Sequence, residues 1–309
     1  MKTLNSRISA AVVSAFFILP SAFGQGNLTP PGAPGPTMKS LDQIEPRTPI
    51  SSLPFTITNA GSYYVTTNLA GGASGGIIID VGGVTLDLMG FELVGGTGVG
   101  VFVNTSGSAR TNIAIRNGTI RQWSGNGIDA TFAFGPQLEN LRVSGNAIGI
   151  RTGDGSMVGG CTAFGNSSNG IVASVGCTIR DSLARKNGAD GIQAGDGSEV
   201  RACIVTDNTG DGIEVANNCH VRDNTCYGNG FASGSGAGVH ATGQNNRIDG
   251  NHVNSGDFGI RADVAGNLII RNSARGNSTN YLFLDTQAFG PTNLVSGLVT
   301  NHPWANFSY

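Results

Sequence analysis

A short apolar strand signal recurs through the second half of the chain at a nearly constant spacing. Its central residue falls at Ile150, Ile171, Ile192, Ile213, Val239, Ile260 and Leu282, so the steps are 21, 21, 21, 26, 21 and 22 residues. Five extra residues, 231–235, account for the long step. An asparagine precedes most copies at a turn, namely Asn146, Asn166, Asn187, Asn208, Asn229 and Asn277. A fixed period of this length predicts a solenoid whose coils stack on one another.

The composition of the repeat separates two kinds of solenoid. Leucine-rich repeats have similar periods and a recurring asparagine, but they need several leucines in every coil. Residues 146–277 contain only two leucines, Leu183 and Leu268, and no helical periodicity between the strand signals. Short β-branched segments separated by Gly and Asn instead predict an all-β, single-stranded parallel β-helix. In that fold, stacked asparagines satisfy the backbone groups of the turns.

Charge is sparse and nearly balanced along the chain. The 309 residues include 49 glycines, 12% of the residues are charged, and the formal net charge is −2. Because no basic stripe is available to neutralise phosphates, we expect no nucleic-acid partner. The regular recurrence of Ile and Val among the glycines predicts ordered β structure with many tight turns.

The first residues have the three parts of a secretory signal peptide. Lys2 and Arg7 precede an apolar stretch, and the small residues Ala22 and Gly24 mark a cleavage site before Gln25. The apolar stretch is too short to anchor the chain across a bilayer, and no second one follows. We therefore expect an exported protein, either secreted, periplasmic or on the cell surface, with no transmembrane segment after cleavage.

Four segments follow from these signals. Residues 1–25 are the predicted signal peptide, and the Pro- and Gly-rich residues 26–54 are predicted to form a linker and an N-terminal cap. Strand signals run from Phe55 to Asp285, which predicts a β-helix over residues 55–285 with coils of 21 to 22 residues. Residues 286–309 depart from the repeat and are expected to cap the last coil.

Five cysteines in an exported chain raise the question of disulfides. Cys161 and Cys203 share one position of the repeat, and Cys177 and Cys219 share another, each pair being two coils apart. Neighbouring coils lie about 4.8 Å apart, which places the members of each pair roughly 9–10 Å apart, beyond disulfide reach. Cys226 belongs to a different row. We therefore predict reduced thiols that serve as small core or turn residues.

The repeated pattern Val-Arg-Asp/Ala-x-x-Ala/Val-x-x-Asn-x-x-x-Gly-Ile-x-Ala resembles a known family. It is similar to the right-handed parallel β-helix repeat of pectate-lyase-like proteins, including the group called carbohydrate-binding proteins and sugar hydrolases. The N-terminal Gly-Ser-Tyr-Tyr-Val and Val-Thr-Leu-Asp-Leu-Met-Gly-Phe stretches resemble the opening coil of exported bacterial members. The resemblance covers residues 55–285 and implies the fold and a polysaccharide partner. It implies no particular activity, because the superfamily includes lyases, hydrolases, epimerases and proteins without known catalysis.

Outward side chains at one position of successive coils should form a column with about 4.8 Å between neighbours. The position after the central apolar residue gives the column Asp129, Arg151, Val172, Gln193, Glu214, His240, Arg261 and Phe283. The position two residues before the centre gives Asn169, Asp190, Asp211, Ala237 and Phe258. Together these columns supply carboxylates, a base and a cation, the groups that sugar chemistry uses. The candidate catalytic residues are Asp190, Asp211, Glu214, His240 and Arg261, and the candidate substrate-binding residues are Gln193, Arg151 and Asp129.

No cofactor is expected from the sequence. Asp190, Asp211 and Glu214 approximate a Ca²⁺ site, but nothing in their spacing demands a cation. Residues 208–215 resemble the Asn-Thr-Asp-Gly-Ile-Asp of polygalacturonases, although the Asp-Asp pair, the Gly-His-Gly and the Arg-Ile-Lys of that family are missing. The Asp-Pro-His of mannuronan epimerases is missing as well.

A second polar column contains Arg180, Arg201 and Arg222 and is a candidate for binding an anionic polymer. Asp181 and Asp223 stand beside it in the sequence, which favours a charge-balanced edge instead. Polar outward residues of both columns are also what an ordinary solvated surface needs.

Two functions remain open at this point. The chain binds an acidic polysaccharide along an outward face and, in the catalytic version, cleaves it by elimination or hydrolysis. Alternatively, it is a non-catalytic structural or adhesive protein of the cell envelope, with the β-helix as a rigid scaffold.

Overall fold

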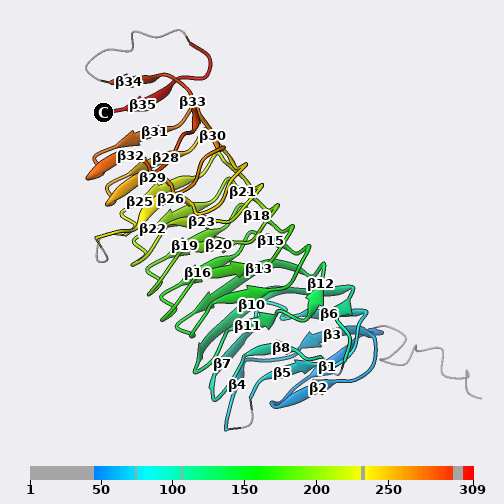
Figure 1. The fold of residues 1–309 in the computed structure, drawn as a ribbon. Helices are drawn as coiled ribbons and strands as arrows, with labels where there is room; N and C mark the ends of the chain where they lie inside the picture. The colour runs from blue at the N-terminus through cyan, green and yellow to red at the C-terminus, as the bar shows by residue number, and fades with distance from the viewer. Residues whose placement is uncertain (1–44, 74, 106, 231–233, 295–301) are drawn as a thin grey trace, which may run out of the picture. The chain divides into compact units, whose positions relative to one another are not determined.

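The chain winds into the coils of a solenoid, and the strands of successive coils are parallel (Figure 1). The computed structural model describes residues 45–309 except residues 74, 106, 231–233 and 295–301. The predicted signal peptide and most of the predicted linker lie outside these residues. Within them, the regular elements are all β-strands, and no helix has the length and hydrophobicity that a membrane crossing requires. The predicted all-β solenoid is confirmed.

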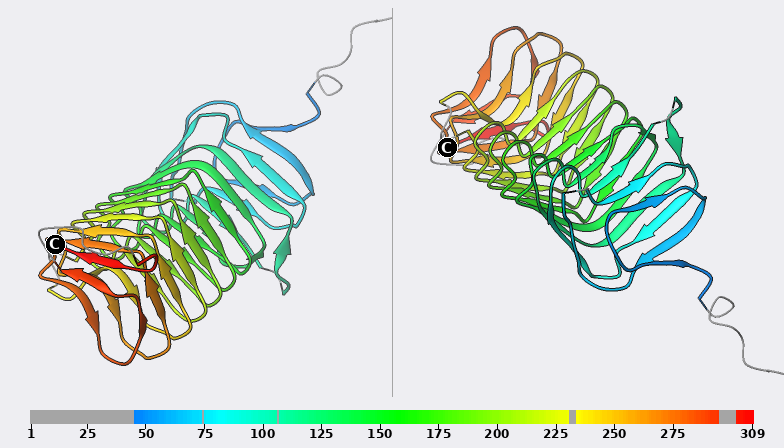
Figure 2. Two further views of the ribbon diagram at one scale, coloured as in Figure 1. Left: turned by 90° about the horizontal axis from the view of Figure 1, so that it is seen from above. Right: turned by 90° about the horizontal axis from the view of Figure 1, so that it is seen from below.

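Each regular coil contributes three short strands, and strands at the same place in successive coils pair in parallel (Figures 1 and 2). The first row contains β1 (Thr48–Ile50), β3 (Gly61–Val65), β6 (Val84–Asp87), β15 (Met157–Gly159), β18 (Thr178–Arg180), β21 (Glu199–Arg201), β24 (His220–Arg222), β27 (Arg247–Asp249), β30 (Leu268–Ile270) and β33 (Ala288–Phe289). The second row contains β4 (Leu69–Ala70), β7 (Glu92–Gly96), β16 (Thr162–Phe164), β19 (Leu183–Arg185), β22 (Ile204–Thr206), β25 (Thr225–Tyr227), β28 (His252–Asn254), β31 (Ser273–Arg275) and β35 (Asn306–Ser308). The third row contains β2 (Phe55–Ile57), β5 (Ile77–Ile79), β8 (Val101–Val103), β11 (Ile128–Ala130), β14 (Ile150–Thr152), β17 (Ile171–Ala173), β20 (Ile192–Ala194), β23 (Ile213–Val215), β26 (Ala237–Ala241), β29 (Phe258–Ala262) and β32 (Thr279–Phe283).

Two long strands join the first two rows into one sheet. β10 (Ile113–Trp123) and β13 (Gln137–Ser144) each run through both rows without a break. The first two rows therefore form a single sheet, and the third row is a separate 11-stranded sheet. β34 (Thr292–Leu294) pairs with β35, and β9 (Arg110–Thr111) pairs with β12 (Ala133–Phe134) outside the rows.

Parallel pairing extends past both limits expected for the β-helix, residues 55 and 285. At the start, β1 pairs with β3, and its Ile50 is fully buried. At the end, β33 pairs with β30 and β35 pairs with β31. The segments expected as caps thus add strands to the first and second rows, because each offers inward residues that continue the core.

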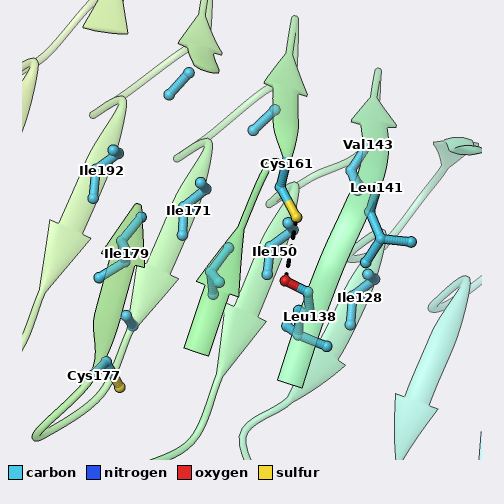
Figure 3. Packing of buried hydrophobic residues seen from close by; sticks show 14 of the residues in the cluster. Ile128, Leu138, Leu141, Val143, Ile150, Cys161, Ile171, Cys177, Ile179 and Ile192 are labelled. Carbon is cyan, nitrogen blue, oxygen red and sulfur yellow. Dashed lines mark hydrogen bonds between the residues drawn. The ribbon is translucent and has the colours of Figure 1, made fainter. Parts of the chain in front are cut away.

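The inward side chains of the three rows fill the core (Figure 3). Ile128, Ile150, Ile171 and Ile192 occupy the same position in consecutive strands of the third row, and each is fully buried. Side chains alternate between core and solvent along these strands, as expected for β structure. The core is therefore a stack of equivalent apolar layers, one for each coil.

The last coil shifts the predicted register by one residue. Tyr281, and not Leu282, pairs with Ile260, so Leu282 stands beside Arg261 in the outward column. The expectation that Phe283 occupies that outward position is wrong. The Tyr281 ring packs against Phe283 at 6.2 Å, and its hydroxyl donates to the carbonyl of Asn272. A tyrosine can hold this inward position because its hydroxyl meets a backbone acceptor there.

Buried asparagines form a ladder at the corner between the second and third rows. The Oδ1 of Asn187 accepts hydrogen bonds from the backbone N–H of Asn166 at 3.1 Å and from its Nδ2 at 2.9 Å. Asn187 donates in the same way to Asn208, and its Nδ2 also donates to the carbonyl of Ala163. The rungs in consecutive coils are Asn146, Asn166, Asn187, Asn208 and Asn229. Each rung thus satisfies a buried N–H of one coil and a carbonyl of another.

Two further ladders, which the sequence pattern did not reveal, occupy the other two corners. The corner between the first and second rows holds Asn224, Asn251, Asn272 and Asn306. The corner between the third and first rows holds Asn246 and Asn267. Earlier coils place Cys161, Ser182 and Cys203 in the first of these ladders and Cys177, Ser198 and Cys219 in the second. The cysteines and serines therefore replace asparagine rungs. For this reason a search for repeated asparagines alone does not find these two ladders.

All five cysteines are free and buried, which confirms the predicted reduced thiols. Ser182 separates Cys161 from Cys203, and the Cys161 Sγ donates to the carbonyl of Leu138 at 3.5 Å (Figure 3). Burial raises the pKa of Cys161 and of Cys203 to about 11. A thiol with so high a pKa carries almost no thiolate at neutral pH, so these residues are structural rather than reactive.

Replacement of a central rung should destabilise the whole solenoid. In Asn208→Ala, the backbone N–H of Asn187 loses its acceptor and the carbonyl of Ala184 loses the Nδ2 donor of Asn208, while Asn187 Nδ2 loses one of its two acceptors. Because each buried unsatisfied group costs about 1–3 kcal/mol, we expect the free energy of unfolding to fall by about 3 kcal/mol or more. Urea denaturation followed by circular dichroism measures it.

The matched control is Asn59→Ala, which changes an exposed asparagine in a surface turn. That change should alter stability by less than about 0.5 kcal/mol. Equal losses in the two variants would contradict the role of the ladder.

Candidate functional site

One outward column of the third row carries six of the eight predicted site residues in register, all but Asp190 and Asp211. It runs through Asp129, Arg151, Val172, Gln193, Glu214, His240 and Arg261. The five inserted residues before β26 do not break it, because Glu214 still pairs with His240. Side chains distant in the sequence are therefore brought to neighbouring positions on one face.

His240 lies between two carboxylates. Its Nδ1 is 2.7 Å from Asp211 Oδ2, and its Nε2 is 3.0 Å from Asp263 Oδ2. Burial opposes the charge on the imidazole, but the hydrogen bonds to Asp211 and then Asp263 outweigh it and raise the pKa of His240. As an imidazolium it donates from both nitrogens, so His240 here positions two carboxylates and offers no free nitrogen as a base.

Arg261 lies one coil after His240 and contacts Asp263 and the insertion. Its Nε donates to Asp263 Oδ1 at 2.8 Å, and its Nη1 donates to the carbonyl of Ser235 at 3.3 Å. Its guanidinium also lies 6.0 Å from the centre of the Phe258 ring. Ser235 is the last residue of the insertion, so this hydrogen bond connects the end of the insertion to Arg261 of the outward column. Residues 231–233 of the insertion lie outside the described residues.

Asp190 lies one coil before Asp211 and is half-buried. Its Oδ1 accepts the backbone N–H of Asp211 at 2.8 Å, and its Oδ2 accepts Asn169 Nδ2 at 3.2 Å. Burial raises the pKa of Asp190 to about 6, and the negative charges of Asp211 and Glu214 add to this effect. Asp190 is thus a carboxyl group that exchanges its proton close to neutral pH, as a general acid or base must.

Glu214 stands between Asp190 and His240 along the face. Its Oε1 accepts Gln193 Nε2 at 2.8 Å, and Gln193 in turn accepts a weak hydrogen bond from Asn169. We call Asp190, Asp211, Glu214, His240, Arg261 and Asp263 together the third-row site. The site holds four carboxyl groups against one guanidinium and one imidazole, so its charge becomes more negative as Asp190 and His240 lose protons.

Three residues of the site lie close enough to surround a small cation. One ligand atom from each of Asp211, Glu214 and His240 falls within 4.8 Å of the others. However, Asp211 Oδ1 already accepts the N–H of Ala237 at 2.6 Å, and its Oδ2 is bonded to His240. An imidazolium has no lone pair for a metal. The observed arrangement is therefore a hydrogen-bonded network, in which Asp190 also takes part through both of its oxygens.

Two predicted substrate-binding residues lie apart from the third-row site. The Asp129 carboxylate caps its own turn by accepting the side chains of Asn126 at 2.9 Å and of Thr131 at 2.6 Å. Arg151 is exposed. It stands two coils, about 10 Å, from Gln193, with Val172 between them. Only Gln193 of the three joins the cluster.

The second polar column is charge-balanced. Arg201 pairs with Glu199 at 3.2 Å, and Arg222 pairs with Glu199 at 2.9 Å and with Asp223 at 3.0 Å. Arg180 pairs with Asp181 at 2.9 Å. These partly exposed pairs offer little surplus positive charge to an anionic polymer.

Sequence reasoning missed Asp263, which binds both His240 and Arg261. It lies two residues after Arg261, so the strand alternation that placed Arg261 outward also places Asp263 outward. Extending the column search by one alternation would have found it.

Comparisons with known proteins address the fold. Residues 75–231 match the family model described as "Right handed beta helix region". The A-module of mannuronan C-5 epimerase AlgE4 from Azotobacter vinelandii is 14% identical with a TM-score of 0.50, covering 77% of this chain and 91% of its own. The Dettilon tailspike protein is 13% identical with a TM-score of 0.52, covering 85% of this chain and 61% of its own. No curated protein sequence matches the chain.

Identities this low establish a shared fold alone. The family match spans just over half of the chain and includes the coils that hold Asp190, Asp211 and Glu214. It confirms the predicted right-handed parallel β-helix. The chain belongs to the right-handed β-helix family.

Proposed function

We propose that this chain is an exported β-helix that binds an acidic polysaccharide along its third-row site and hydrolyses it. The observation that carries the proposal is the carboxyl of Asp190, whose pKa of about 6 sets it apart in the same cluster as Asp211 and Glu214. Glycoside hydrolysis uses two carboxyl groups in different environments, one as acid and one as carboxylate. Exported location is supported by the signal-peptide pattern of residues 1–25.

Each residue has a role in this mechanism. Asp190 gives its proton to the glycosidic oxygen as the bond from that oxygen to the anomeric carbon breaks. Glu214 accepts the proton of the water that attacks the anomeric carbon. His240 holds Asp211 and Asp263 in place, and Arg261 faces the sugar carboxylates from the end of the column. The substrate lies across successive coils, because the side chains that meet it come from strands stacked in one direction.

An acidic substrate fits this site only when the site is protonated. Loss of protons from Asp190 and His240 adds negative charge, which repels a polyanion. Protonation at mildly acidic pH lowers that repulsion and also supplies the acid form of Asp190. One protein of similar fold is described as a mannuronan epimerase, which supports a polyuronate as the first polymer to test.

Binding of a polyuronate should weaken as the pH rises. We expect the affinity for polygalacturonate to fall between about pH 5 and about pH 8, while binding of a neutral galactan stays level. The reason is that Asp190, whose pKa is about 6, becomes charged over this range. Affinity electrophoresis at several pH values measures it, and an affinity for the polyuronate that rises with pH would reject the electrostatic argument.

Asp190→Asn should remove hydrolysis and stabilise the fold at higher pH. Loss of a general acid should lower the hydrolysis rate by about 10²- to 10⁴-fold, measured by reducing ends. The folded pKa of Asp190 lies above its usual 3.8, so its ionisation opposes folding as the pH rises through about 6. The variant should therefore melt higher than the wild type at about pH 8 and equally at about pH 4.

Glu199→Gln is the matched control, because Glu199 is a half-buried outward glutamate of the first row. Its activity should equal that of the wild type. If Asp190→Asn keeps full activity on a polymer that the wild type cleaves, Asp190 is not the proton donor.

A second candidate function is a non-catalytic scaffold. It is favoured by the mutual pairing of the third-row site, in which His240 and Arg261 are already bonded to Asp211 and Asp263. Absence of binding and cleavage across a panel of acidic and neutral polysaccharides would select this function.

Export has its own test. Expression of the full chain in a bacterial host should release a processed protein outside the cytoplasm, and N-terminal sequencing should find Gln25 as its first residue. Recovery of the chain with residues 1–24 intact in the cytoplasm would reject the predicted signal peptide.

A further inference from the structure

A cavity of about 560 Å³ opens on the first row at the C-terminal end of the β-helix. Its strand side is formed by Arg247, Leu268 and Ala288, which follow one another in register on β27, β30 and β33. His302 and Trp304 of the C-terminal segment also line the cavity. The third-row site lies on a different row, so this cavity is separate from it.

The C-terminal segment is held in place by the last rung of an asparagine ladder. Asn306 is fully buried, and its Oδ1 accepts the N–H of Asn272 at 2.9 Å. Its Nδ2 donates to the carbonyls of Ile269 at 2.9 Å and of Gly290 at 3.1 Å. A Cβ on Gly290 would lie 1.9 Å from the carbonyl oxygen of Trp304, so only glycine allows this close approach. Trp304 is therefore presented to the cavity from a fixed backbone.

Two guanidinium groups share one buried carboxylate at this place. Asp249, whose side chain is 4% exposed, accepts Arg247 Nη2 at 2.7 Å and Arg271 Nε at 2.6 Å. Burial opposes its charge, but the hydrogen bonds from Arg271 and Arg247 outweigh it and lower the pKa of Asp249. One negative charge thus meets two positive charges. The group keeps a surplus positive charge beside the cavity at any pH near neutral.

The surplus charge stands beside an exposed aromatic ring. Arg271 lies 5.8 Å from the centre of the Trp304 ring, and Trp304 is 46% exposed. The Arg247 side chain is 42% exposed, and its Nη1 makes no hydrogen bond with the described residues. Leu268 and Ile270 add apolar surface to the cavity. The lining of the cavity therefore combines apolar side chains, an indole and a guanidinium whose Nη1 has no hydrogen-bond partner among the described residues.

We propose that this cavity is a binding site for a uronate sugar. The volume lies within the usual range for small-ligand pockets of about 300–1,000 Å³. A pyranose ring presents apolar C–H groups to an indole, and its carboxylate is an acceptor for a guanidinium. The ligand class follows from the chemistry of this cavity alone. The inference thus does not depend on hydrolysis at the third-row site.

Tryptophan fluorescence can report ligand binding to this cavity without an added label. The chain has two tryptophans, of which Trp123 is 2% exposed in the core and Trp304 lines the cavity. Titration of the full-length protein with D-glucuronate should change the tryptophan emission in a saturable way, and Trp304→Phe should abolish the change. D-Glucose, the neutral match, should bind at least about tenfold more weakly, since it lacks the carboxylate.

Arg247→Gln should weaken glucuronate binding by about tenfold or more and leave glucose unaffected. The variant should fold, because Arg271 still pairs with both oxygens of Asp249. Arg275→Gln is the matched control, since Arg275 lies 5.3 Å from the Tyr309 ring in a neighbouring groove and does not line this cavity. Its affinity for glucuronate should equal that of the wild type.

Several results would overturn the assignment. These are no emission change at millimolar glucuronate, equal affinity for glucose, or unchanged binding in Arg247→Gln. Tighter binding of benzoate than of glucuronate would assign the cavity to aromatic acids instead. Asp190→Asn should keep the full emission response. If Asp190→Asn loses hydrolysis but still binds glucuronate, the two sites act independently. Either proposal can then fail while the other stands.

Discussion

The hydrogen bonds that ladder side chains make with the backbone and with one another at the three corners hold the coils in register. At each corner the backbone turns sharply and leaves buried N–H and C=O groups that the strands cannot pair. A side chain from the next coil satisfies them, as Asn208 does for Asn187 and Ala184. No coil is complete without its neighbours, so stability belongs to the stack rather than to a single coil. Cysteine and serine serve in the same rows because their small polar groups reach the same backbone atoms.

A locked register turns the outer surface into columns, and the third-row site is a consequence of that. Glu214 and His240 are 26 residues apart in the sequence but adjacent in the sheet, because β23 pairs with β26 in the register of the other coils. Asp211 meets His240 across the same step, and Arg261 binds the end of the insertion at Ser235. An extra loop on a β-helix can therefore add groups to a site without disturbing the strands beneath it.

The sequence predicted the parts of this structure that repeat, and it failed where the repeat is broken or where side-chain torsions decide. The inward isoleucines and the outward column follow from the period and from strand alternation. The bonding of His240 to both Asp211 and Asp263 depends on rotamers, on which periodicity carries no information. Tyr281 shifted the last coil because an aromatic ring with a hydroxyl can fill an inward position that the pattern assigned to an aliphatic residue.

The two proposed sites respond differently to pH, and this follows from the groups that form them. The third-row site gains negative charge as Asp190, whose pKa is about 6, loses its proton. The cavity beside Trp304 relies on Arg247 and Arg271, which stay charged, and on Asp249, whose pKa is lowered. A polyuronate would therefore remain attracted to the C-terminal cavity at a pH where the third-row site repels it. Binding and chemistry on one chain would then be controlled separately, because the ladders keep the two sites on different rows of the same rigid stack.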